Sequence, residues 1–238
     1  MKMRFGKAIS CLMIGLFGII LAGAFGCTMN KNAIYQKMVS YISNKYNDSF
    51  EFVTSYGGRP GSSFHSIYVK SKQYPNAFIS VSCNEVNGDD VFFDNYLAVK
   101  YEEQTRELLN NIMNGYGTEI LLFYNAGNYA YTENGTENTT FEEFIREKTS
   151  SIIFTALIKT DFSPNHELIE EKLKQDMSSY GICCSGILYF CLDNPEFEQL
   201  NANNLFSGYL SKKTYDSSCF FQMTEDGKLT NVEWGTSK

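Results

Sequence analysis

Cysteines are the first side chains in this sequence that could act as nucleophiles or bind a metal. Five of them follow residue 27: Cys83, Cys183, Cys184, Cys191 and Cys219. An odd number cannot be fully paired within one chain. Cys183 and Cys191 share a face of one expected strand but are too far apart for a disulfide. No cysteine pair has zinc-site spacing with a histidine nearby, so we expect buried free thiols and no metal site.

Histidine, the usual general base, occurs only at His65 and His166. A nucleophile needs a base in contact with it and a third group that orients the base. The sequence contains no nucleophile motif that would bring such groups together. We therefore expect surface or helix-cap histidines, and the sequence predicts no catalytic residue and no cofactor.

Two short segments have residues typical of ligand loops. Asp89-Asp90 follows Asn87-Gly88, but the residues before the glycine lack the spacing of a calcium loop, so a solvated turn is expected. The glycines of residues 57–61 could hold an anion. A strand is expected after them where a phosphate loop requires a helix, so we interpret the segment as a plain loop.

One aromatic segment is a candidate binding edge. Aromatic residues make up 15% of the chain, and most tyrosines fall on expected core faces. Tyrosine and asparagine together suit a partner or a glycan. The candidate binding residues are Tyr124, Asn125, Asn128, Tyr129 and Tyr131.

The N-terminus has the pattern of an export signal. Lys2, Arg4 and Lys7 precede the uncharged and mostly apolar segment Ala8–Phe25. The positive end stays on the cytoplasmic side while the apolar segment enters the bilayer. We therefore expect residues 1–26 to be a signal peptide and residues 27–238 to be one extracytoplasmic domain.

The residues that end this leader, Ala24-Phe25-Gly26-Cys27, resemble the lipobox of bacterial lipoproteins. The resemblance implies that Cys27 is lipidated, for example with palmitate, and becomes the first residue. Two alternatives stay open: cleavage after Ala22-Gly23-Ala24 by an ordinary signal peptidase, or retention of the apolar segment as an anchor. The resemblance also implies that the protein lies on the outer face of the cell membrane, held by lipid.

The charge of the body argues against nucleic acid as a partner. The whole chain carries a net charge of −7, and its first 27 residues contain three basic and no acidic residues. The remainder therefore carries −10, which repels phosphate backbones. The expected partners are the lipid bilayer, through the anchor, and an unknown protein or small ligand.

Periodicity predicts an α+β fold. A helix over Asn32–Asn47 precedes an antiparallel meander of three strands, Phe50–Ser55, Ser63–Lys70 and Ala77–Asn84. A long helix capped by Asp94 or Asn95 is expected to reach about Asn114. A strand over Glu119–Tyr124, which Asn128–Tyr131 could extend, precedes the polar segment Thr132–Asn138. That segment separates two expected halves, residues 32–131 and 140–238.

Helices and strands alternate in the second half. The expected elements are a helix over Phe141–Lys148, a strand over Ser151–Lys159, a helix capped by Ser163 with Pro164 in its first turn and ended by Gly181, a strand over Cys183–Leu192, a short helix from Asn194 to about Phe206, and a hairpin of Ser217–Thr224 with Leu229–Trp234 around Asp226-Gly227.

Several segments in this order resemble a group of uncharacterised small lipoproteins of Clostridia-type Gram-positive bacteria. The segments are Tyr41-Ile42-x2-Lys45-Tyr46-x3-Phe50-Glu51-Phe52-Val53, Gly57-Gly58, Tyr68-Val69-x-Ser71-Lys72-x-Tyr74-Pro75, Asp94-Asn95-Tyr96-x3-Lys100-Tyr101-Glu102, Ser151-Ile152-Ile153-Phe154, Ser185-Gly186-x-Leu188-Tyr189-Phe190 and Val232-Glu233-Trp234. The resemblance implies a surface lipoprotein with an α+β body, and it implies no enzymatic activity.

Together these observations favour a membrane-anchored surface protein whose body binds a partner or ligand without catalysis. An extracellular hydrolase is one alternative, and two inward carboxylates at glycosidase spacing would favour it. A solute-binding component of an importer is the other, which the two expected halves keep open.

Overall fold

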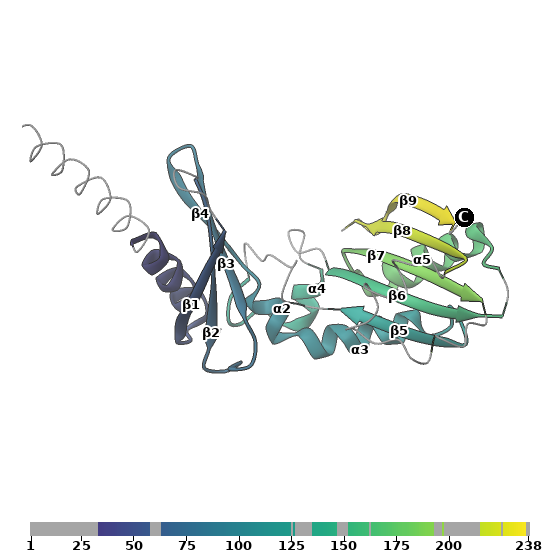
Figure 1. Cartoon of the computed structure of the whole chain (residues 1–238), viewed down its shortest axis with the longest axis horizontal. Coiled ribbons are helices and arrows are strands. Elements are labelled where there is room, and N and C mark those ends of the chain that lie inside the picture. Colours follow the sequence, from purple (N-terminus) through teal and green to yellow (C-terminus); the bar gives the residue numbers. More distant parts are fainter. Residues whose placement is uncertain are drawn as a thin grey trace, which may run out of the picture.

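The computed structural model describes residues 33–57, 63–124, 126, 135–146, 152–161, 163–192, 197, 215–224 and 226–236. These residues form an α+β fold with a four-stranded and a five-stranded sheet (Figure 1). The expected fold class is therefore confirmed, including the early antiparallel meander and the C-terminal hairpin. Three expectations fall outside the described residues: the lipidation site at Cys27, the strand extension over Asn128–Tyr131, and residues 198–206 of the expected short helix.

The first sheet has the order β1-β2-β3-β4 and is antiparallel throughout. A helix over residues 33–46 precedes it and covers one face, because Met38 and Ile42 are fully buried against its core. Figure 1 shows this helix beside β1. The strands are β1 (Phe50–Gly57), β2 (Phe64–Ser71), β3 (Ile79–Val86) and β4 (Asp89–Asp94).

The strand β4 was not predicted. The turn expected over four residues occupies only Asn87 and Gly88, whose φ angles are 56° and 91°. Two successive residues in the left-handed region form a tight hairpin turn, so Asp89 can already pair with Val86. The acidic pair that was expected in a solvated turn therefore begins a strand.

The long helix expected after Asp94 is interrupted. Its two parts are α2 (Tyr96–Lys100) and α3 (Glu102–Met113), and Tyr101 between them has φ −106° and ψ 15°. Tyr101 packs against Phe144, and its hydroxyl donates to the carbonyl of Thr139. These contacts with a distant segment explain the break, which helical periodicity does not reveal.

The second sheet has the order β5-β6-β7-β8-β9, with one parallel pair, β6 and β7, and antiparallel pairing elsewhere. The parallel pair is connected through α5 (His166–Tyr180), as a crossover requires. The short helix α4 (Phe141–Ile145) precedes the pair. The strands are β5 (Glu119–Tyr124), β6 (Ile152–Thr160), β7 (Cys184–Leu192), β8 (Ser217–Met223) and β9 (Leu229–Thr236).

The expected start of α5 was wrong by two residues. Asn165, rather than Ser163, is the N-cap, and its Oδ1 accepts a hydrogen bond from the Leu168 N–H at 3.3 Å. Pro164 consequently lies before the helix and not in its first turn. The expected end is confirmed, because Gly181 takes a left-handed φ of 66°.

One buried cluster contains residues of both sheets, from Met38 of the first helix to Met223 of β8. A second, smaller cluster of Leu157, Cys191 and Phe197 lies on the other face of the second sheet. β5 falls in the first of the two expected halves but is hydrogen-bonded to β6 in the second sheet. The chain therefore passes from the first sheet to the second before β5, and not at the polar segment Thr132–Asn138.

Candidate functional site

The strand β1 forms an exposed edge of the first sheet. Its six central residues, Glu51 to Tyr56, are all exposed, including Phe52 at 43% and Tyr56 at 46%. Among the described residues its strand partner is β2 alone. Large aromatic side chains are seldom left exposed together on a strand, and such surfaces often mark interaction sites.

A groove of about 600 Å³ lies between the N-terminal helix and β1. Tyr35 and Phe52 form its aromatic wall, since their rings stack with centroids 5.7 Å apart and planes 17° apart. His65 of β2 contacts the Tyr35 ring edge-on at 6.4 Å. The groove is lined by Tyr35, Gln36, Val39, Ser40 and Phe52, and we call it the helix–β1 groove.

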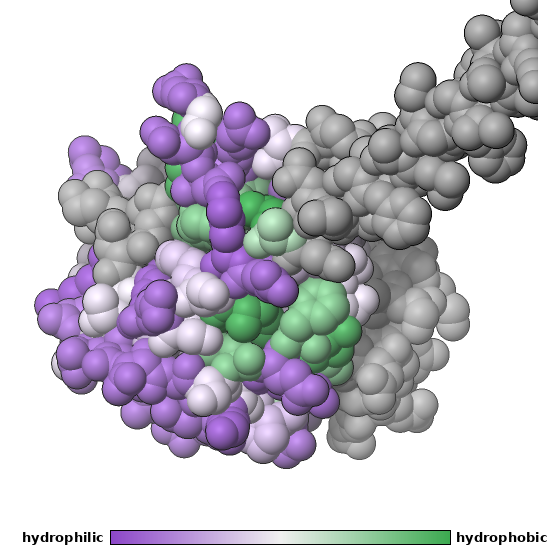
Figure 2. All heavy atoms as spheres, turned by 90° about the vertical axis from the view of Figure 1, so that its left-hand side faces the viewer, coloured by the Kyte–Doolittle hydropathy of each residue, from purple (hydrophilic) through white to green (hydrophobic). Residues whose placement is uncertain are grey.

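The side of the molecule that carries the N-terminal helix has a mixed surface. Figure 2 shows apolar residues gathered there among hydrophilic ones. The lining of the helix–β1 groove has the same mixture, since Val39 and Phe52 are apolar while Gln36 and Ser40 offer an amide and a hydroxyl. A binding site commonly combines such apolar walls with a few polar groups.

A buried ion pair fixes the helix that forms one wall of this groove. Lys45 Nζ lies 2.8 Å from Asp94 Oδ2, and the Asp94 side chain is fully buried. The hydroxyls of Tyr41 and Tyr46 donate to the same carboxylate at 3.1 and 2.8 Å. The Tyr96 N–H donates to it at 3.0 Å, so one carboxylate joins the first helix to the start of α2.

A second groove, of about 380 Å³, lies at the start of β1, and we call it the lysine groove. Lys70 and Lys72 contribute two positive charges there. Two negative charges come from Glu51 and from Asp48, whose carboxylate accepts hydrogen bonds from the Ser49 N–H and the Ser71 hydroxyl. In the described part of the chain, neither lysine takes part in an ion pair. The lining consists of Ser49, Phe50, Glu51, Lys70, Ser71, Lys72 and Pro75.

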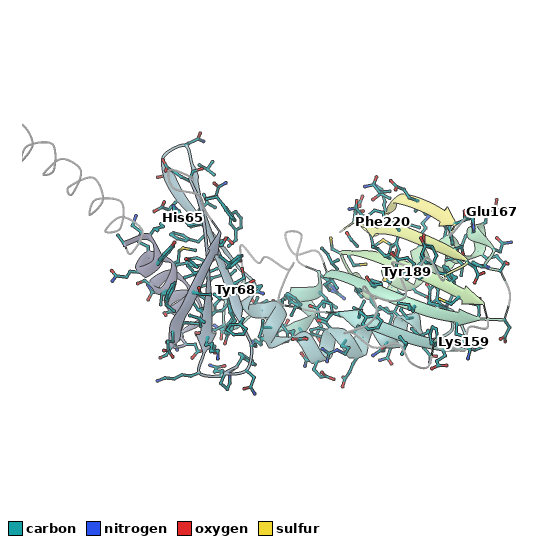
Figure 3. The ribbon with its side chains drawn as sticks, viewed as in Figure 1. His65, Tyr68, Lys159, Glu167, Tyr189 and Phe220 are labelled. Atoms are coloured by element: carbon teal, nitrogen blue, oxygen red, sulfur yellow. The ribbon has the colours of Figure 1, made fainter. Side chains whose placement is uncertain are left out.

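The opposite face of the first sheet carries a row of aromatic rings. Tyr56 stacks on Tyr68 at 4.1 Å, and Tyr68 meets Phe78 edge-on at 5.9 Å. His65 and Tyr68, both labelled on β2 in Figure 3, belong to opposite faces because they are three positions apart, an odd number. The rings of Tyr35, Phe52 and His65 therefore lie on one face of the first sheet, and the row of Tyr56, Tyr68 and Phe78 lies on the other.

The predicted binding edge is described only at Tyr124. This side chain is 7% exposed and belongs to the main core, where burial raises the pKa of its hydroxyl to about 12. Asn125, Asn128, Tyr129 and Tyr131 lie outside the described residues, as does Cys27. The structure does not bring Tyr124 to the exposed edge at β1.

The cysteines and histidines have packing roles in the described residues. Cys83, Cys184 and Cys219 are free and buried. His166 stacks on Trp234 with ring centroids 3.8 Å apart, and Trp234 Nε1 donates to Glu170 at 2.7 Å. Asp90, one of the two acidic residues of the segment considered for calcium, pairs with Lys37 at 2.8 Å. Within the described ranges, no group of three or more His, Cys, Asp or Glu side chains could hold a metal ion.

The helix–β1 groove was not predicted from the sequence, although a signal for it was present. Tyr35 and Val39 are four residues apart and lie beside the core stripe of the first helix. Gln36 and Ser40 repeat the same spacing on the polar side. Such a second stripe at helical spacing marks a face that borders the core and is open to solvent.

No family model matches the chain, and no curated protein matches it. A crystal structure of a DUF5037 family protein from Ruminococcus gnavus ATCC 29149 aligns with a TM-score of 0.41 and 11% identity. The alignment covers 83% of this chain and 94% of that chain. A likeness at this level indicates neither an activity nor a partner.

The described helices include none with the length and apolar character needed to span a bilayer. The apolar segment Ala8–Phe25 lies outside the residues described.

Proposed function

We propose that this chain is a lipoprotein held at the outer face of the cell membrane through Cys27, and that its body binds a partner without catalysing a reaction. The observation that carries the binding role is the helix–β1 groove. Its wall stacks the half-buried Tyr35 on the exposed Phe52, and the polar side chains of Gln36 and Ser40 are exposed beside an exposed sheet edge. The leader pattern that ends at Cys27 supports the anchoring role.

The two roles are consistent in distance. Cys27 precedes the first described helical residue, Ala33, by six residues, and a chain of that length spans at most about 20 Å. A lipid on Cys27 would therefore hold the first helix, and the groove it forms, close to the membrane surface. The net charge of −10 on the body favours a protein or small-molecule partner over nucleic acid.

Anchoring is tested by labelling with radioactive palmitate in the native host. The wild type should incorporate the label and Cys27→Ala should not. Cys11→Ala, which removes the other leader cysteine, is the matched control and should be labelled like the wild type. Equal labelling of wild type and Cys27→Ala would refute lipidation at this residue.

Binding is tested by photo-crosslinking on intact cells. Benzoylphenylalanine in place of Gln36, an exposed groove residue, should capture a distinct adduct. The same probe in place of Leu168, which is 62% exposed on α5, is the control and should not. Adding Phe52→Asp to the Gln36 probe should abolish the adduct, because a charge in the aromatic wall opposes apolar contact. No adduct at Gln36, or an identical one at Leu168, would contradict the proposal.

A further inference from the structure

The Asp94 carboxylate is held at both of its oxygens. Oδ1 accepts hydrogen bonds from the Tyr46 hydroxyl at 2.8 Å and from the Tyr96 backbone N–H at 3.0 Å. Oδ2 accepts from Lys45 Nζ at 2.8 Å and from the Tyr41 hydroxyl at 3.1 Å. The carboxyl carbon lies one C–O bond beyond Oδ2, so the lysine nitrogen is within about 4 Å of that carbon.

The Tyr41 hydroxyl bridges the nitrogen and the carboxylate. It accepts a hydrogen bond from Lys45 Nζ at 2.9 Å and donates its own to Asp94 Oδ2. A hydroxyl in this position can take a proton from the ammonium while it gives its own proton to the carboxylate. The transfer leaves a neutral amine, which is the nucleophilic form of a lysine side chain.

The pair is largely shielded from solvent. The Asp94 side chain is fully buried, the Lys45 side chain is 10% exposed, and Tyr46 and Tyr96 beside them are buried. A proton transfer within the pair removes two opposite charges from a place where charges are costly. Exclusion of water also hinders hydrolysis, the reverse of a condensation between the two groups.

Two donors point at the oxygen on which negative charge develops when an amine attacks a carboxyl carbon. During such an attack the electron pair of one C–O bond moves onto its oxygen. The Tyr46 hydroxyl and the Tyr96 N–H lie at the distances from Oδ1 that are typical of donors that stabilise such an oxygen in acyl transfer. An amine, a proton carrier and a stabilised oxygen therefore surround one carbon atom.

We propose that Lys45 and Asp94 condense into an amide bond between their side chains, an isopeptide bond, after the chain has folded. One proton first passes from Lys45 Nζ through the Tyr41 hydroxyl to Oδ2. The Nζ–Cγ bond then forms, and Tyr46 and Tyr96 hold the negative charge on Oδ1. A second proton follows the same route, the Cγ–Oδ2 bond breaks, and Oδ1 regains its double bond as one water molecule leaves. Nothing is oxidised or reduced.

Fixed geometry is what makes this condensation favourable. Groups held in contact react as if each were present at an effective concentration of about 10⁵ to 10⁸ M, whereas the same groups apart in water do not condense. The Lys37–Asp90 pair has the same separation of 2.8 Å, but its side chains are 63% and 30% exposed. Water surrounds that pair and competes with the amine, so it stays ionic.

The bond closes a covalent loop around the first sheet. Lys45 precedes β1 and Asp94 ends β4, so all four strands lie between the joined residues. In a chain anchored through Cys27, a pull between the membrane and the second sheet passes along the bond and bypasses these strands. The inference goes beyond the proposed function and does not rest on it, because its evidence lies within the body.

The test uses the full chain, purified in detergent from its native host, denatured, digested with trypsin and analysed by tandem mass spectrometry. The bond blocks cleavage after Lys45. It should yield a branched product that joins the peptides containing residues 45 and 94 and is lighter than their sum by one water molecule. Lys45→Arg keeps the positive charge without a nucleophilic amine and should lose this product. Lys37→Arg, the same change in the exposed pair, is the control and should keep it.

The proton carrier is tested with Tyr41→Phe, which keeps the ring and removes the hydroxyl. After pulse labelling of newly made chain, the branched product should accumulate about a hundredfold more slowly than in the wild type. Tyr35→Phe, which removes a hydroxyl from the same helix beside the groove, is the control and should leave the rate unchanged. Circular dichroism establishes that both variants are folded.

Two outcomes would overturn the inference. One is complete cleavage after Lys45 in wild-type chain that has been kept folded until no further change occurs, a result that requires no variant to fold. The other is a branched product that persists in Lys45→Arg, because another residue would then supply the nitrogen. Equal rates for Tyr41→Phe and the wild type would overturn the proton route. Palmitate labelling and the Gln36 adduct are unaffected by any of these results, so the proposed function is tested separately.

Discussion

Lys45 Nζ donates to Asp94 Oδ2 at 2.8 Å, with the lysine side chain 10% exposed and the aspartate fully buried. The Lys45 ammonium also lies 5.3 and 5.2 Å from the ring centroids of Tyr41 and Tyr46. The pair connects the helix that precedes the first sheet with the residue that ends β4. It therefore holds the wall of the helix–β1 groove in position.

Asp94→Ala should lower the free energy of unfolding by about 3–5 kcal/mol, because it leaves a buried ammonium without its counter-charge. Urea denaturation followed by circular dichroism measures the change. Asp90→Ala is the control, since it removes the carboxylate of the exposed Lys37–Asp90 pair and should have a far smaller effect. Equal effects of the two substitutions would contradict a special role for Asp94.

Asn165→Ala should destabilise the protein by about 1 kcal/mol through loss of the α5 cap. Ser163→Ala should change stability little, although sequence patterning favoured Ser163 as the cap. Thermal or urea unfolding of both variants separates the two positions. A larger loss at Ser163 would show that α5 begins earlier than the structure has it.

Gly186→Ala should destabilise by about 1–3 kcal/mol through overpacking of the core. A Cβ atom at this position would lie 2.5 Å from Phe221 and 2.9 Å from Phe154. Gly235→Ala is the control, because its Cβ would meet only the Ser218 hydroxyl, which can rotate away. Comparable unfolding midpoints for Gly186→Ala and wild type would indicate a looser core.

Stability should fall in alkaline solution in part because of Cys83. Burial raises the pKa of this thiol from 9.0 to about 11, with the nearby Asp90 carboxylate adding to the effect. The unfolded chain therefore releases the proton at lower pH than the folded chain does. The contribution of Cys83 is fully present below pH 9 and is lost as the pH rises toward 11.

The measurement is urea unfolding under reducing conditions from pH 7 to pH 11, with wild type and Cys83→Ala compared at each value. The difference in stability between the two proteins should shrink above pH 9. A difference that stays constant across this range would show that the thiol titrates alike in both states.

Local signals in the sequence predicted most of the fold. Turn residues such as Asp226-Gly227 and alternating apolar residues located the hairpins, and Gly181 located the end of α5. The misses have tertiary causes. Tyr101 breaks a helix because of its contacts with Thr139 and Phe144, and β4 begins with acidic residues whose pairing with β3 is not visible in their own segment.

The candidate site was harder to predict than the fold, because it depends on long-range contacts. The Tyr35–Phe52 wall joins two elements whose relative placement the sequence does not reveal. The exposure of β1 is a property of the whole sheet, since an isolated strand pattern is the same for a central strand and for an edge. The residue type of Tyr124 suggests a binding edge, but residue type alone does not reveal that this side chain points into the core.

The pairing pattern of the two sheets has a consequence for the order in which they form. Every strand of the first sheet is bonded to a neighbour in sequence, so only short loops must close. The parallel pair β6–β7 must await the crossover through α5, and contacts of greater sequence separation slow folding. On refolding, amides around Val69 and Val81 should gain protection from hydrogen exchange before those around Ala156 and Leu188.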